Sequence, residues 1–180
     1  MTMATARATS TIMSMATPIK AKTRKPRILV AGLGNLLLKD DGVGSHAVRE
    51  LLKAPPRGVI VADVGCAVLD ALHLMKWAEK ILAIDAMQAG GAPGTLYLCG
   101  LQDVADTDTR ASLHELSLLA ALRFLPPQAQ PEIVILGVEP ETIDYGLDLS
   151  PPVAAALPLV TGAAREVVSR WRETGIPKSN

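Results

Sequence analysis

The sequence contains few aromatic residues and no long apolar run. Phenylalanine, tryptophan and tyrosine make up 3% of its 180 residues, while hydrophobic residues as a whole make up 49%. A core must therefore be built from leucine, valine, isoleucine and alanine, and the chain is long enough for one domain with a substantial core. No uninterrupted apolar stretch approaches the roughly 20 residues of a membrane-spanning helix. The sequence therefore predicts no insertion into a membrane.

Cysteines are also scarce. Only Cys66 and Cys99 occur, far apart and at a spacing that matches neither a metal site nor a redox motif. This argues against a disulfide framework and predicts a protein of the reducing cytoplasm. We expect both cysteines to be small, buried apolar residues.

The net charge of zero hides an asymmetry along the chain. The first 27 residues carry six basic residues and no acidic residue, which leaves the rest of the chain with a net charge of −6. An acidic folded part argues against nucleic acid as a ligand. Residues 1–26 are rich in methionine, alanine, threonine and serine and lack the apolar segment of a secretory signal. We therefore expect a disordered basic tail over residues 1–26 and one folded domain over residues 27–175.

The rest of the chain alternates between strand and helix patterns. Apolar runs typical of strands occupy five segments: 28–32, 59–62, 81–84, 95–98 and 133–137. Helical patterns occupy 43–53, 67–77, 113–125 and a final region from Ser150 to about residue 173, in which Pro158 and Gly162 are expected to kink or split the helix. The fourth strand follows the third too closely for a crossover helix, so we expect it to run antiparallel to the third. The alternation predicts an α/β fold: a single three-layer α/β/α domain with a mixed, mostly parallel sheet of about five strands.

Three places carry residues that could do chemistry. Asp40 and Asp41 follow the first strand, Asp85 ends the third strand, and His114 begins the third helix. In sheets of this kind, functional groups gather at the carboxyl ends of the strands. Two carboxylates and an imidazole form an oxygen–oxygen–nitrogen set that suits a borderline divalent transition metal. The dipole at a helix N-terminus disfavours a charged imidazole, which would leave His114 neutral and able to bind a metal.

Each of these residues also has an ordinary structural interpretation. Asp41 could cap the N-terminus of the first helix, and Asp85 could form a turn at the end of its strand. His114 could be a solvated residue of a first helical turn. The other two histidines, His46 and His73, are expected on helix surfaces.

A partial dinucleotide-binding motif is a further alternative. Gly32 and Gly34 follow the first strand and Asp63 ends the second, as in part of a nucleotide-binding fingerprint. However, Leu37 stands at the position of the third glycine, and the acid pair at the helix start would repel a pyrophosphate. A dinucleotide-binding enzyme stays open as an alternative.

Short motifs in a fixed order carry a family resemblance. They are Gly32-Leu33-Gly34-Asn35, Asp40-Asp41-Gly42-Val43-Gly44, Ile84-Asp85-Ala86, Pro93-Gly94-Thr95, Ser112-Leu113-His114-Glu115-Leu116, Gly137-Val138-Glu139-Pro140 and Leu149-Ser150-Pro151. Together they resemble the NiFe-hydrogenase maturation endopeptidases over about residues 28–172. The family commonly has an Asp-Gly-Gly-Thr type of turn after the second strand, whereas this chain has Asp63-Val64-Gly65-Cys66. This difference bears on any substrate contact made by the backbone of that turn.

The resemblance implies an endopeptidase, of an aspartic or metal-assisted type, that removes the C-terminal extension of the hydrogenase large-subunit precursor after nickel insertion. In the family, an acid of the first loop, an aspartate after the third strand and a histidine at a helix start bind the metal. They correspond to Asp41, Asp85 and His114, which are also the implied catalytic residues, with Asp40 as a further candidate. The implied cofactor is nickel, supplied by the precursor, and the precursor is the implied partner of a cytoplasmic monomer. The same ligands would also suit a nickel-binding maturation chaperone without proteolytic activity.

Overall fold

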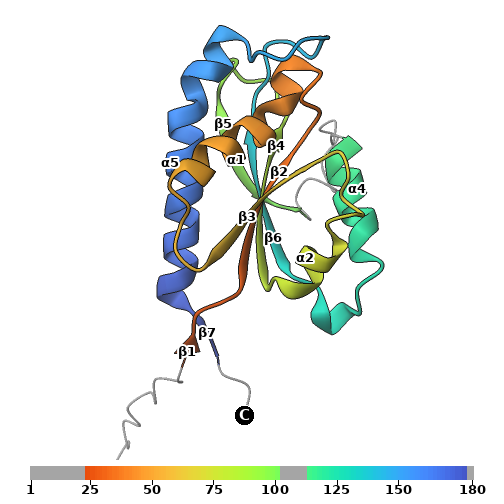
Figure 1. Cartoon of the computed structure of the whole chain (residues 1–180), viewed down its shortest axis with the longest axis vertical. Helices are drawn as coiled ribbons and strands as arrows, with labels where there is room; N and C mark the ends of the chain where they lie inside the picture. The colour runs from red at the N-terminus through yellow and green to blue at the C-terminus, as the bar shows by residue number, and fades with distance from the viewer. Residues whose placement is uncertain (1–22, 102–112, 178–180) are drawn as a thin grey trace, which may run out of the picture.

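The computed structural model describes residues 23–101 and 113–177 of the chain, except for the side chains of residues 113–116 and 177. Its centre is a five-stranded sheet in the order β3-β2-β4-β6-β5. The strands are β2 (Ile28–Leu33), β3 (Val59–Gly65), β4 (Lys80–Ala86), β5 (Leu96–Gly100) and β6 (Glu132–Val138). All neighbours in the sheet are parallel except β5, which is antiparallel to β6. The predicted mixed, mostly parallel sheet is confirmed (Figure 1).

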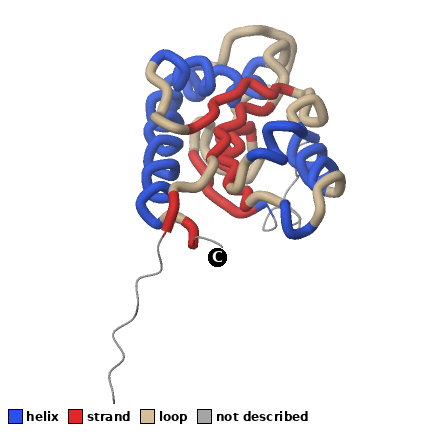
Figure 2. The backbone as a smooth tube through the Cα atoms, turned by 60° about the horizontal axis from the view of Figure 1, so that its bottom comes forward, coloured by secondary structure: helices blue, strands red, loops and turns tan. Residues whose placement is uncertain are grey.

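Helices cover both faces of this sheet (Figure 2). On one face lie α1 (Val43–Lys53) and α5 (Pro151–Thr174), and on the other lie α2 (Leu72–Trp77) and α4 (Leu113–Leu122). Two short 3₁₀ helices lie in connections: η1 (Lys39–Gly42) and η2 (Pro127–Ala129). The result is the predicted three-layer α/β/α arrangement. Among the described residues, no helix combines the length and apolarity that a membrane crossing requires.

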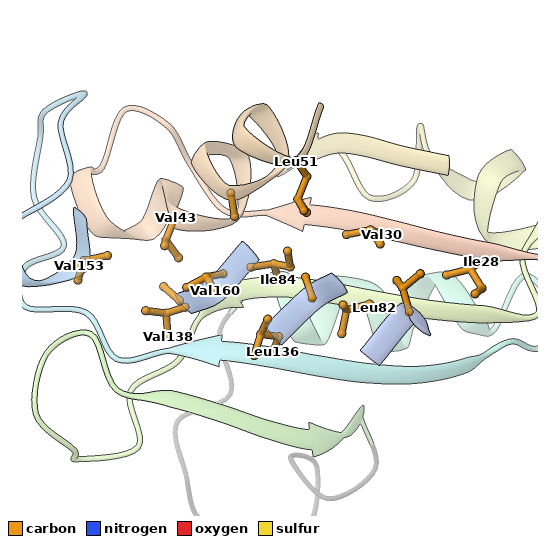
Figure 3. Packing of buried hydrophobic residues seen from close by; sticks show 14 of the residues in the cluster. Ile28, Val30, Val43, Leu51, Leu82, Ile84, Leu136, Val138, Val153 and Val160 are labelled. Atoms are coloured by element: carbon orange, nitrogen blue, oxygen red, sulfur yellow. The ribbon is translucent and has the colours of Figure 1, made fainter. Parts of the chain in front are cut away.

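Alternating side chains of the strands form two separate apolar cores. Val30 of β2 and Leu82 of β4 belong to the core beneath α1 and α5, which Figure 3 shows from close by. Leu29, the residue before Val30, belongs to the core on the side of α2 and α4. This is the expected consequence of the two-residue period of a strand. Full burial of a Val, Leu or Ile side chain contributes about 1.5–3 kcal/mol, so the two cores hold the sheet firmly between its helices.

The sequence predicted a kink or a split in the final helix, and the split does not occur. Helix α5 runs without interruption through Pro158, although a proline inside a helix costs about 3 kcal/mol. Pro158 lies on the exposed side of the helix. Six residues of the opposite side are buried against the sheet: Val153, Ala156, Val160, Ala164, Val168 and Trp171. Burial of this stripe outweighs the cost of the proline, so the helix continues past it.

Two helix boundaries differ from the sequence-based expectation, and the direction of β5 agrees with it. Helix α2 begins at Leu72 because residues 67–71 form successive turns, and α4 ends at Leu122 rather than at residue 125. Strand β5 does run antiparallel to β4, but it pairs with β6 at the edge of the sheet. Sequence patterns place such boundaries poorly because helix and strand ends depend on tertiary contacts.

A small ribbon joins the two ends of the described chain. Strand β1 (Thr23–Arg24) pairs antiparallel with β7 (Ile176–Pro177). Arg24 donates hydrogen bonds to Glu79, and this lowers the pKa of the Glu79 carboxyl to about 2. Strands of two residues have no alternation that a sequence pattern could reveal. Residues 1–22 of the predicted tail lie outside the described residues.

Candidate functional site

The predicted acid Asp85 lies where the neighbouring strands β2 and β4 end. Gly32 of β2 pairs with Ile84 of β4, so Gly34 and Asp85 both lie just beyond this pair. Asp85 is fully buried, and its Oδ1 accepts a hydrogen bond of 2.9 Å from the N–H of Ala86. A Cβ atom at Gly34 would lie 3.6 Å from the same Oδ1 atom. The Asp85 carboxylate is therefore next to the glycine turn that follows β2.

Asp41 reaches the same turn from η1. Its Oδ2 accepts a hydrogen bond of 2.8 Å from the N–H of Asn35, and the residue is 8% exposed. A Cβ atom at Gly34 would lie 1.8 Å from the backbone oxygen of Asp41, and Gly34 has a φ angle of +108°. Only glycine tolerates both this contact and this conformation. The structure thus brings Asp41 and Asp85, two of the three predicted site residues, together around Gly34.

The start of α1 shows that one structural interpretation, an N-cap at Asp41, is wrong. Asp41 does not cap this helix, because the N-cap residue is Gly42 and no side chain caps the first turn. A Cβ atom at Gly32 would lie 2.3 Å from the backbone oxygen of Gly44, so the helix packs directly on the end of β2. The glycines that resemble a dinucleotide motif therefore serve the close contact between helix and strand. The same contact holds η1 and its acids over the ends of the strands.

Asp40, the further catalytic candidate, is bound to a different part of the chain. It is fully buried, and its two carboxylate oxygens accept four hydrogen bonds. Two come from Ser150, through its N–H and its Oγ, and the others come from the N–H groups of Glu141 and Thr142. Hydrogen bonds to a charged carboxylate are about twice as strong as neutral ones. Asp40 therefore joins the loop after β2 to the segment before α5.

His114, the third predicted site residue, is the second residue of α4, but its side chain lies outside the described residues. Within the part of the chain that the structure describes, there is no group of three histidine, cysteine or acidic side chains that could hold a metal ion. A three-ligand site with Asp41 and Asp85 therefore stays a prediction. Its third member would come from the start of α4.

The end of β3 and Cys66, which follows it, also border this site. Ser45 of α1 donates a hydrogen bond to Asp63, and Arg49 lies 3.9 Å from the same carboxylate. Two residues further on, Gly65 has a φ angle of +56°, and Cys66 Sγ lies 3.6 Å from the backbone oxygen of Gly34. Cys66 is exposed and Cys99 is half-buried, so the expectation that both are fully buried is wrong. The sequence signal that could have placed Cys66 here is its position beyond the end of a parallel strand beside β2.

Another carboxylate, that of Glu139, binds the loop after β4, and the sequence did not identify it as functional. Glu139 is buried and accepts hydrogen bonds from the N–H groups of Ala89, Gly90 and Gly91 and from the hydroxyl of Tyr97. Burial by itself would raise the pKa of Glu139, but the four hydrogen bonds together lower it below its ordinary value. Burial and the neighbouring carboxylate raise the pKa of Tyr97. Because this loop directly follows Asp85, Glu139 helps to fix the surroundings of that acid.

A groove of about 320 Å³ begins at Cys66. Residues 66–70 form one wall, and Ser117, Ala120 and Phe124 on and just after α4 form the other. Phe124 and Leu69 are strongly exposed apolar residues there. The groove therefore runs between the turn that contacts Gly34 and the helix that carries His114.

Known proteins resemble this chain in both sequence and fold. The family model described as hydrogenase maturation protease matches residues 45–167. The chain is 32% identical over 157 residues to the hydrogenase 2 maturation protease of Escherichia coli K12, a match that covers 83% of this chain and 93% of that protein. The solved structure of the hydrogenase maturating endopeptidase HybD from E. coli matches with 30% identity and a TM-score of 0.70 over 84% of this chain and 98% of that one. The NiFe hydrogenase maturation protease HybD from Thermococcus kodakarensis matches with 27% identity and a TM-score of 0.69 over 79% of this chain and 99% of that one.

Proposed function

The chain belongs to the hydrogenase maturation protease family, and from that premise we propose that it removes the C-terminal extension of a NiFe-hydrogenase large-subunit precursor. The observation that supports this activity in this chain is the meeting of Asp41 and Asp85 around Gly34 at the carboxyl edge of the sheet. Acidic residues that gather at the carboxyl ends of the strands lie where sheets of this kind bind their ligands. The proposal also includes that the protein acts as a monomer in the cytoplasm.

Recognition of nickel in the precursor is the second part of the proposal. The metal is a component of the substrate here, held by the precursor before cleavage. Asp41 and Asp85 offer oxygen donors and His114 offers a nitrogen donor, a set that suits a borderline divalent metal. Only a precursor that already contains nickel would then place its cleavage site beside these residues. Cleavage would be conditional on completed metal insertion.

Hydrolysis of a peptide bond sets clear requirements for these side chains. The oxygen of a water molecule must bond to the carbonyl carbon, the carbon–nitrogen bond must break, and the released nitrogen must receive a proton. A carboxylate beside the water can accept its proton and pass it to the leaving nitrogen. In this proposal, Asp41 and Asp85 would make that transfer, and Asp40 would position the loop that carries Asp41. When present beside the bond, the nickel of the precursor would polarise the carbonyl group.

The test is an incubation of the purified protein with nickel-loaded and nickel-free large-subunit precursor. We expect mass spectrometry to show loss of the C-terminal peptide from the loaded precursor alone. An intact loaded precursor would contradict the proposed cleavage, and would favour a chaperone if it still bound the protein. Equal cleavage of both precursors would contradict nickel recognition and leave the protease activity in place.

A further inference from the structure

Two loops at the carboxyl end of the sheet, residues 37–40 and residues 141–150, form one rigid unit. The N–H of Gly146 donates a hydrogen bond of 2.9 Å to the backbone oxygen of Leu37, and the N–H of Lys39 donates one of 2.9 Å to the backbone oxygen of Gly146. The carboxylate of Asp40 binds three further N–H groups of residues 141–150. Lys39 is held in a left-handed conformation with a φ angle of 47°, which is uncommon for a residue with a side chain. The position of these loops is therefore determined by many contacts.

This unit exposes large apolar side chains to solvent. They are Leu37 (60% exposed), Ile143 (44%), Tyr145 (85%) and Leu147 (63%), which we call the apolar lip. Because Gly146 pairs with Leu38 in a parallel bridge, Tyr145 lies opposite Leu37 and Leu147 lies opposite Lys39 in the register. Scattered exposed apolar residues are common, but a group of large ones on a rigid unit marks a surface that another molecule covers.

The apolar lip lies directly beside the candidate site. Both include the segment from Asn35 to Asp41, whose ends are joined by the hydrogen bond from the Asn35 N–H to the Asp41 carboxylate. His46 of α1 also contacts the backbone oxygen of Leu147, at 3.2 Å. Figure 1 shows the connection between β6 and α5 at the same end of the molecule as the start of α1. A protein bound on the lip would therefore have its nearest chain segments beside Asp41.

The charges around the lip indicate what kind of surface fits it. Glu141, Asp144 and Asp148 are exposed between and beside the apolar residues. Residues 140–149 contain no basic residue, and these three carboxylates outnumber the one nearby basic residue of the facing loop, the half-buried Lys39 beside Gly146. A second copy of this chain would bring the same three carboxylates against them if it bound through the same patch, as symmetric dimers do. Like charges facing each other disfavour that arrangement. The complementary surface is an apolar patch bordered by lysine or arginine residues.

We propose that the apolar lip docks the folded body of the large-subunit precursor through an apolar patch with a basic border. This inference rests on the proposed function, because it names the surface that holds the same substrate. Docking away from the cleaved bond gives affinity and places the C-terminal extension, while the chemistry stays with Asp41 and Asp85. Exposed apolar and aromatic anchors commonly supply most of the binding energy of such an interface.

The test compares a lip variant with a matched control. The lip variant carries Tyr145→Ser and Leu147→Ser, and the control carries Leu52→Ser and Leu98→Ser, which are exposed apolar residues outside the two loops. All four side chains are exposed, so both variants should keep the thermal stability of the wild type. Binding of the nickel-loaded precursor is measured by titration, and its cleavage by steady-state kinetics.

We expect the lip variant to bind the precursor at least about tenfold more weakly than wild type, with a raised KM and a kcat within about twofold. The control should match the wild type in both assays. Equal binding by the lip variant and the control would overturn the docking surface. A wild-type dimer that the lip variant loses in light scattering would also overturn it, in favour of a second copy. Binding and cleavage are measured separately. A wild-type protein that leaves the precursor uncleaved contradicts the proposed function, while the comparison of binding still tests the docking surface.

Discussion

Ser150 donates two hydrogen bonds to Asp40, one from its N–H to Oδ1 and one from its Oγ to Oδ2, and both are 2.7 Å long. The two residues are 110 positions apart in the chain. Their contact joins the loop after β2 to the residue before α5, and so links the candidate site to the apolar lip. Asp40 therefore joins two loops, while the adjacent Asp41 borders Gly34 in the candidate site.

Asp40→Ala should lower stability more than it lowers the chemistry. The substitution removes the acceptor of four hydrogen bonds and leaves buried N–H groups without a partner, so the free energy of unfolding should fall by about 3 kcal/mol or more. Ser150→Ala, which removes one hydroxyl donor, should cost about 1 kcal/mol. Urea denaturation measures both. A stable Asp40→Ala protein that no longer cleaves the precursor would instead make Asp40 catalytic.

Asp41→Ala, Asp85→Ala and His114→Ala should each abolish precursor cleavage. If these residues hold the nickel of the precursor and move the proton, the loss of any one should reduce the rate by at least about a hundredfold. Mass spectrometry of the precursor measures the rate, and circular dichroism checks the fold. His73→Ala, a change at an exposed histidine whose ring lies 3.0 Å from the backbone oxygen of Asp70, is the control. Full processing by the Asp41 or Asp85 variant would contradict the site.

Gly34→Ala should damage the site through the backbone. Its Cβ atom would lie 1.8 Å from the backbone oxygen of Asp41, and its φ angle of +108° suits only glycine, so η1 must shift. We expect a loss of about 1–3 kcal/mol in the free energy of unfolding together with a strong loss of cleavage. Gly162→Ala has open space within α5 and should instead raise stability by about 0.5–1 kcal/mol. Thermal melts compare the two. Wild-type cleavage by Gly34→Ala would show that the contact is not needed.

Glu139 should make stability depend on acid pH. Its folded-state pKa is lowered, so its contribution is complete above the ordinary pKa of a glutamate and is lost as the pH falls through the lowered value. Glu139→Gln keeps the shape but cannot be ionised, so its unfolding free energy should vary less over this acid range than that of the wild type. Denaturant titrations at a series of pH values measure the difference. Tyr97→Phe, which removes one of the four donors, should give a smaller effect, and identical acid profiles for wild type and Glu139→Gln would contradict this role.

Much of the fold and part of the site were predictable from sequence. The order of strands and helices follows from apolar periodicity, which is local information. Asp41 and Asp85 were predicted to meet because parallel neighbouring strands end at one edge of a sheet, and both now border Gly34. The predicted split at Pro158 was wrong because a proline signal is local, whereas the buried stripe of α5 acts along its whole length.

Other features depend on residues that are distant in the chain. Nothing near Asp40 in the sequence indicates that Ser150 will bind it, and nothing near Glu139 indicates the N–H groups of residues 89–91. The two loops of the apolar lip likewise become one surface through the pairing of Leu38 with Gly146 and the hydrogen bonds of Asp40.

The amino-acid sequence alone therefore determined the α/β layers, the family and the acids that gather at the strand ends, because these follow from local periodicity and short motifs. Only the tertiary structure decided that Asp40 binds the segment before α5 while Asp41 borders Gly34, and that Leu37 and Tyr145 share an exposed surface. The physical reason is that hydrogen-bond partners and solvent exposure are set by chain segments that meet only after folding.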